Sequence, residues 1–96
     1  MIVSISKDGA IRVIRAEVDR LLKGEEHLDN VVGSLIIFIT RFEDRSLLDL
    51  APPIAKSRLN EMLSEFRTTG RYEYFVRSGE LVDDSETMRK LVRLLD

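Results

Sequence analysis

Residues 31–39 read VVGSLIIFI, and this apolar run decides the fold. It belongs to a longer pattern in which Leu28, Leu35 and Phe42 recur on one face at helical spacing. LIIF alone would also suit a buried strand, but the pattern extends from about residue 26 to residue 42, a length that favours a helix. Because apolar side chains occupy most of its sides, we expect this helix at the centre of a small domain.

The segment before this helix predicts a second helix over residues 8–23, with Gly24 as its left-handed end. An alternative pairs residues 1–6 with residues 11–14 as a β-hairpin around the turn Asp8-Gly9. The helix is favoured because its apolar side chains recur every three or four residues. These side chains are Ile11, Ile14, Val18, Leu21 and Leu22.

The C-terminal half predicts two further helices. A short helical turn over residues 46–50 is stopped by Pro52 and Pro53, and Pro53 suits the first position of the next helix. That helix ends at Gly70, and a last helix begins at Asp84 or Ser85. The 96 residues therefore predict a mainly α protein, a compact bundle of about four helices in a single domain, residues 1–96.

Between the last two helices, residues 71–84 read RYEYFVRSGELVDD. Alternating side chains before and after the Ser78-Gly79 turn predict one short β-hairpin around residues 72–82. A helix followed by a hairpin is also the order of elements in a winged-helix DNA-binding domain. The segment is therefore either a wing or a connector that displays a different surface.

The charges favour the second interpretation. The chain has 15 basic and 17 acidic residues, a net charge of −2, so any basic surface must be local. The return limb of the hairpin, GELVDD, would repel phosphates, and Glu61 and Glu65 interrupt the basic residues of the preceding helix. Nucleic-acid binding is therefore the second hypothesis, carried by Arg58, Arg67, Arg71 and Arg77.

The residues needed for catalysis or metal binding are scarce. The chain has no cysteine, one histidine (His27) and no D-x-D-x-D-G loop. We therefore expect no enzyme activity, no metal and no cofactor. The start MIVSISKDGAIR lacks a signal-peptide pattern, and the longest apolar run is far shorter than the roughly 20 residues that cross a bilayer, so the sequence predicts a cytoplasmic protein.

Protein binding remains as the expected function, with two acidic patches as candidate surfaces. The first is Glu25, Glu26 and Asp29. The second is favoured because aromatic anchors accompany charges that steer association; an alternative is that the aromatic rings only close the core and the acids only cap the last helix. This second candidate site consists of Tyr72, Tyr74, Phe75, Glu80, Asp83, Asp84 and Glu86.

Three stretches, RLLKGEEHLDNVV, LNEMLSEF and LVDDSETMRKLVRLL, together resemble the pattern of colicin D-type bacterial immunity proteins over residues 20–95. The resemblance implies a cytoplasmic helical inhibitor, a monomer or small homo-oligomer, that occludes the active cleft of a basic nuclease toxin through an acidic face. The chain departs from a purely acidic mimic in its middle, where basic residues interleave with the acids. These are Arg41, Arg45, Lys56 and Arg58.

Overall fold

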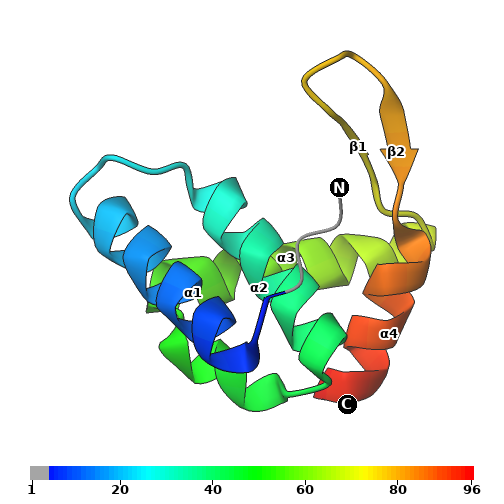
Figure 1. Ribbon diagram of the computed structural model, residues 1–96. Helices are drawn as coiled ribbons and strands as arrows, with labels where there is room; N and C mark the ends of the chain where they lie inside the picture. Colours follow the sequence, from blue (N-terminus) through cyan, green and yellow to red (C-terminus); the bar gives the residue numbers. More distant parts are fainter. Residues whose placement is uncertain (1–4) are drawn as a thin grey trace.

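The computed structural model describes residues 5–96 (Figure 1). Within that part of the chain lie four α-helices, one 3-10 helix (η1) and a two-stranded antiparallel sheet, which confirms the predicted mainly α fold with a short hairpin. In chain order, the elements are α1 (Lys7–Leu22), α2 (Leu28–Phe42), η1 (Arg45–Leu50), α3 (Pro53–Thr69), β1 (Glu73–Phe75), β2 (Leu81–Asp83) and α4 (Ser85–Leu95).

Helix α2 forms the centre of the bundle, as its apolar run predicted. It contacts α1, η1, α3 and α4, and Figure 1 shows it running between α1 on one side and α4 on the other. Leu35 and Ile39 are fully buried, and they belong to one core with Ile14 of α1, Leu63 of α3 and Leu91 of α4. Phe42, which recurs on the apolar face of the central helix, is only partly buried at the edge of this core, and so is Leu95 of α4.

Local hydrogen bonds set the helix ends. Ser6 caps α1 by accepting the N–H of Gly9 at 3.0 Å. Because residues 11–14 are helical, the alternative hairpin is wrong for that strand, while most of its other strand lies outside the described residues. Helix α3 begins at Pro53 and ends before Gly70, whose φ of 70° is left-handed, as predicted.

Helix α2 begins at Leu28, two residues later than expected. The carboxylate of Glu26 accepts hydrogen bonds from the N–H of His27 at 3.0 Å and from the side-chain amide of Asn30 at 2.9 Å. These side-chain bonds satisfy polar groups at the entry to α2 without the two additional helical residues.

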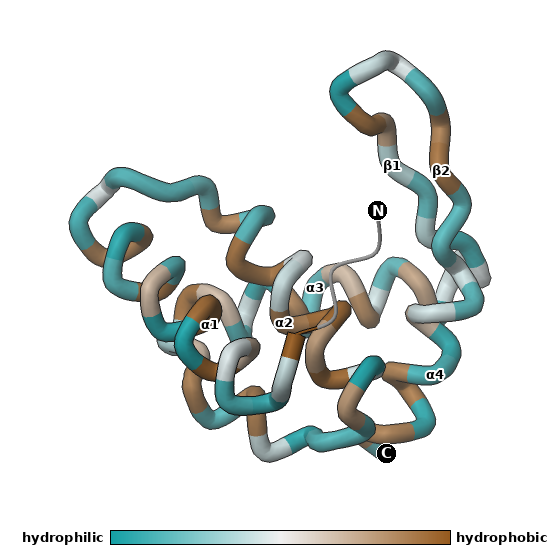
Figure 2. Tube along the Cα trace, viewed as in Figure 1, coloured by the Kyte–Doolittle hydropathy of each residue, from teal (hydrophilic) through white to brown (hydrophobic). Residues whose placement is uncertain are grey.

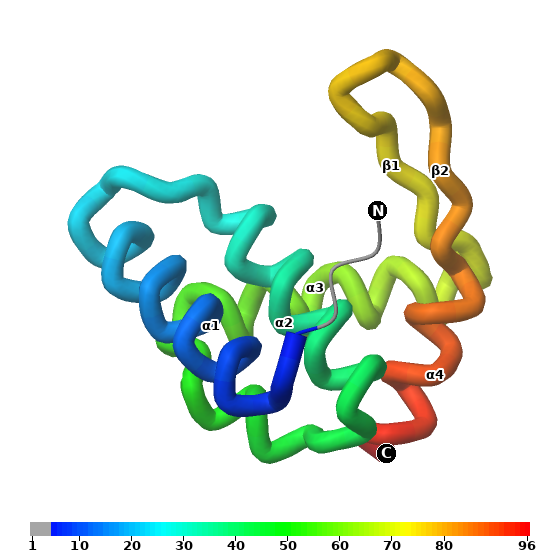
Figure 3. Tube along the Cα trace, viewed as in Figure 1, coloured from blue at the N-terminus to red at the C-terminus, as the bar shows by residue number. Residues whose placement is uncertain are grey.

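The hairpin projects from the helical body and joins α3 to α4 (Figures 1 and 3). Its register pairs Glu73 with Asp83 and Phe75 with Leu81, and Gly79 closes the turn with a φ of 87°. Figure 2 shows apolar positions on the hairpin as well as inside the bundle. None of the helices in residues 5–96 has the length and apolarity required to cross a membrane.

The central position of α2 predicts that alanine substitutions at two isoleucines, two residues apart, will lower the free energy of unfolding by different amounts. Ile39 is fully buried and Ile37 is 52% exposed. Ile39→Ala should lower the free energy of unfolding by about 2 to 5 kcal/mol, and Ile37→Ala by less than about 1 kcal/mol. Urea denaturation of both variants measures the difference; equal losses would contradict the central role of α2.

Candidate groove between helix α2 and the hairpin

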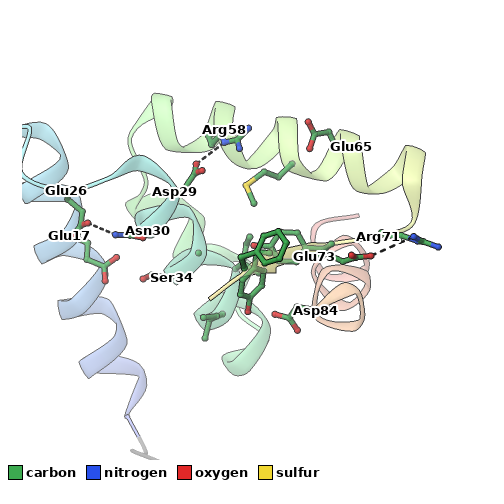
Figure 4. Close-up of a pocket in the computed structure, with 17 residues that line it drawn as sticks. Glu17, Glu26, Asp29, Asn30, Ser34, Arg58, Glu65, Arg71, Glu73 and Asp84 are labelled. Carbon is green, nitrogen blue, oxygen red and sulfur yellow. Dashed lines mark hydrogen bonds and ion pairs between the residues drawn. The ribbon is translucent and has the colours of Figure 1, made fainter. Parts of the chain in front are cut away.

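An open groove with a volume of about 830 Å³ lies between the hairpin and the outer face of α2. We call it the acidic groove. Its floor is one stripe of α2, and its sides come from α1 with the entry to α2, from α3, and from the hairpin with the first residue after it (Figure 4). The floor stripe consists of Asn30, Gly33, Ser34 and Ile37.

The charge around the groove is strongly negative. Carboxylates come from every side. The lining contains only two guanidinium groups, those of Arg58 and Arg71, and Arg20, outside the lining, pairs with Glu26 at 3.4 Å. A concave surface that carries one sign of charge concentrates its field and attracts oppositely charged partners. The carboxylates belong to Glu17, Glu26, Asp29, Glu65, Glu73 and Asp84.

Both arginines of the groove are already engaged. Arg58 pairs with Asp29 at 3.0 Å and with Glu61 at 3.1 Å, and its hydrogen bond to Asp29, followed by that to Glu61, raises the pKa of Arg58. Arg71 lies 3.9 Å from Glu73.

Three carboxylates of the groove have no basic partner among residues 5–96: Glu17, Glu65 and Asp84. The Oε2 atom of Glu17 is also shielded from solvent and has no hydrogen-bond partner in the described part of the chain. A shielded acceptor without a partner is unfavourable, typically by about 1 to 3 kcal/mol. The groove therefore keeps the capacity to bind cationic groups.

The three aromatic residues of the predicted binding site have different environments. Tyr72 packs against the core, and burial raises the pKa of its hydroxyl. Tyr74 is 39% exposed and Phe75 is 73% exposed, and the rings of Tyr72 and Tyr74 lie 5.5 Å apart. Only Tyr74 and Phe75 are therefore open enough to act as anchors for a partner.

The acidic residues of the predicted site also differ in their contacts and positions. Asp83 accepts hydrogen bonds from the N–H of Ser85 at 2.9 Å and from its hydroxyl at 2.5 Å. The same hydroxyl accepts the N–H of Tyr72 at 2.9 Å, which ties both strands to the start of α4. Asp83 therefore has a structural role at the junction of the hairpin and α4. Asp84 lines the groove, whereas Glu80 and Glu86 are exposed outside its lining.

Folding brings the two acidic patches of the sequence together. Glu26 and Asp29 from the first patch line the same groove as Asp84, Tyr74 and Phe75 from the second. The sequence presents the two as competing surfaces because more than 40 residues separate Asp29 from Tyr72 in the chain. Part of each patch therefore belongs to one surface, whereas Glu25, Glu80 and Glu86 lie outside the lining of the groove.

Sequence reasoning missed several residues of this groove, among them Glu17, Ser34 and Glu65. One signal was present. Gly33 and Ser34 interrupt the apolar run of α2, and a glycine within a helix is about 1 kcal/mol less favourable than alanine. Apart from the adjacent backbone of its own helix, a Cβ atom added at Gly33 would meet no atom within 4 Å, so packing against the other elements in residues 5–96 does not require the glycine.

Within residues 5–96, no three histidine, cysteine or carboxylate side chains are grouped so that they could hold a metal ion. A scan of protein-family models and searches of curated proteins and of solved structures found no match to this chain. The function is therefore inferred from the chemistry of the acidic groove.

The hydrogen bonds at Asp83 predict a dependence of stability on pH. The Ser85 hydroxyl, and then the Ser85 N–H, lower the pKa of Asp83 from its ordinary value of 3.8. A lowered folded pKa contributes stability that is present above the unfolded pKa and is lost as the pH falls through the folded pKa. Asp83→Asn should therefore lower the free energy of unfolding at pH 7, and the difference from wild type should vanish in acid below the folded pKa.

Urea denaturation at a series of pH values from neutral to strongly acidic measures this difference. Glu80→Gln, at an exposed side chain outside the Ser85 network, is the matched control and should follow the wild-type curve. A constant difference between Asp83→Asn and wild type at every pH would contradict the structural role of the carboxylate.

The separation of the aromatic residues predicts unequal effects on stability. Tyr72→Ala should lower the free energy of unfolding by about 2 kcal/mol or more, because it removes a ring from the edge of the core. Phe75→Ala should lower it by less than about 0.5 kcal/mol, and Tyr74→Ala should change the thermal midpoint little. A large fall in the midpoint of Tyr74→Ala would place that ring in the core and remove it from the binding surface.

Proposed function

We propose that this chain is a protein-binding inhibitor that uses the acidic groove and the hairpin to block a basic surface of another protein. The observation that carries this proposal is the combination of six carboxylates with the exposed rings of Tyr74 and Phe75 around one groove. Charges of one sign accelerate association with an oppositely charged partner, and desolvated aromatic anchors slow its dissociation.

A nucleic-acid-cleaving enzyme is the partner class that this chemistry favours. Such an enzyme holds its substrate largely through lysine and arginine side chains that contact phosphates. An acidic groove with a projecting hairpin is complementary to such a basic cleft and would compete with the substrate. The resemblance to colicin D-type immunity proteins points in the same direction, and we place this activity in the cytoplasm, which suits a chain without cysteine.

The winged-helix alternative has weaker support from the ion pairs. Of the four arginines that it requires, Arg58 pairs with Asp29, Arg67 pairs with Asp96 at 3.0 Å, and Arg71 lies near Glu73. Contacts with phosphates would have to compete with these carboxylates. The order of helix and hairpin fits a winged helix, but the acidic residues on the hairpin and around the groove oppose a polyanion.

Photocrosslinking followed by an activity assay tests the proposal. A benzophenone amino acid at position 75 should crosslink to one discrete basic protein in the cells that produce this chain, and the same group at position 60, on the exposed side of α3, should not. Purified wild-type chain should then inhibit that protein, and Asp84→Lys should weaken inhibition about tenfold or more, mainly through slower association.

Two results would overturn the proposal. One is a crosslinked protein that stays fully active with excess wild-type chain. The other is sub-micromolar affinity for duplex DNA at about 150 mM salt, measured by fluorescence anisotropy, which would favour the winged-helix alternative.

A further inference from the structure

Helix α2 is covered by other elements on most sides, but one stripe of it remains open. Asn30 and Ile37 are exposed on this stripe, and they line the floor of the acidic groove with Gly33 and Ser34 between them. These positions recur at the spacing of one helical face. An open helical stripe with small residues at its middle allows another backbone to approach closely.

Gly33 supplies the strongest indication of such an approach. It lies inside α2, where alanine would give a more stable helix. A methyl group placed on its Cα would have no atom within 4 Å apart from the adjacent backbone of the same helix. No contact within residues 5–96 therefore explains the glycine. A partner whose backbone or side chain occupies this space would explain it.

The surroundings of the open stripe define the chemistry of that partner. Ile37, Met62 and Phe75 supply apolar surface, and the three carboxylates without a basic partner among residues 5–96 come from different elements of the groove. Figure 4 shows these carboxylates spaced around the apolar centre. An occupant that satisfies all of them needs an apolar stripe with cationic side chains on both sides. The three carboxylates are those of Glu17, Glu65 and Asp84.

A helix fits this description and the size of the groove. A helix about 10 Å in diameter with a rise of 1.5 Å per residue fills on the order of 120 Å³ per residue. The 830 Å³ of the groove therefore accommodates about two turns. Laying an amphipathic helix against helical walls is a common mode of peptide recognition, and methionine and aromatic side chains adapt well to it.

We propose that the acidic groove binds a cationic amphipathic helix of the partner protein, with the helix lying across Gly33 and a lysine or arginine of the helix reaching the shielded carboxylate of Glu17. This inference rests on the proposed function and specifies the structural element that the partner presents.

A synthetic peptide provides the probe. It has about 18 residues, or five helical turns, with leucines on one helical face and lysines and arginines on both sides of them. Isotope-labelled chain, titrated with this peptide at about 150 mM salt, should show backbone amide shifts concentrated at residues 30–37. A peptide of the same composition with two central prolines should bind about tenfold more weakly or worse, because it cannot form the helix.

Two variants of the chain make the test specific. Gly33→Ala should raise the melting temperature by a few degrees, yet it should weaken peptide binding about tenfold or more because a methyl group blocks the closest approach. Asn60→Ala, at an exposed position of α3 outside the groove, is the matched control and should also raise the melting temperature without changing affinity. Glu17→Gln should weaken binding and reduce its dependence on salt.

Three outcomes would overturn the inference. The first is an unchanged peptide affinity in Gly33→Ala, and the second is equal binding of the proline peptide, which would indicate an extended occupant. The third is a dimer of the chain, detected by sedimentation and dissociated by Gly33→Ala, which would indicate that a second copy occupies the groove. The crosslinking assay at position 75 separates this inference from the proposed function. Suppose that position 75 crosslinks to a partner that the chain inhibits, while Gly33→Ala binds the peptide with unchanged affinity. The groove would then not be the helix site, but the proposed inhibitor function would stand.

Discussion

The burial of α2 is the constraint on which the rest of the structure depends. Val31, Val32, Leu35, Ile36 and Ile39 are buried almost completely, and a helix this apolar must be covered on several sides at once. Helices α1, α3 and α4 and the short η1 segment supply that cover. The stripe from Asn30 to Ile37 is the part of α2 that needs no cover, because Asn30, Gly33 and Ser34 leave it little apolar surface to hide. The groove is therefore a direct consequence of how the central helix is enclosed.

A second, smaller constraint fixes the position of the hairpin. The side chain of Ser85 accepts the N–H of Tyr72 and donates to Asp83, so one hydroxyl joins the start of the hairpin, its end and the first turn of α4. Tyr72 packs against the core from the same point. A two-stranded ribbon is marginally stable by itself in water, and these contacts anchor its base to the helices. Tyr74 and Phe75 can then remain exposed while their backbone is held in place.

The carboxylates of the groove fall into two groups, those that pair with arginines and those that remain available to a ligand. Asp29, Glu26 and Glu73 pair with arginines, while Glu17, Glu65 and Asp84 have no such partner among residues 5–96. The Arg20–Glu26 pair joins α1 to the entry of α2, and the Arg58–Asp29 pair joins α3 to α2. The carboxylates without a basic partner leave negative charge for a ligand. The Glu17 carboxylate has an oxygen shielded from water, so a cation that reached it would interact in a medium less screened than the open surface. This division explains how a protein with a net charge of only −2 can present a strongly acidic surface.

The helices, the hairpin and the central position of α2 could all be predicted from the amino-acid sequence. These features follow from local patterns: the apolar spacing of residues 28–42, the proline at position 53, and the turn at Ser78-Gly79. Helix α2 begins two residues later than predicted, where the carboxylate of Glu26 bonds the N–H of His27 and the side chain of Asn30. The sequence also identified Tyr74, Phe75 and Asp84 as candidates for a binding surface, because aromatic and acidic residues stand close together there.

The tertiary packing, in contrast, was needed to show which of these residues share a surface. It joined Glu26 and Asp29 to Asp84, added Glu17 and Glu65 from two further helices, and assigned Asp83 to the anchor of the hairpin. Residues far apart in the chain approach one another only through the packing of helices around α2, and periodicity describes one helix at a time. The glycine at position 33 shows the same limit: its position is plain in the sequence, but only the packing of the bundle shows that no other element covers it.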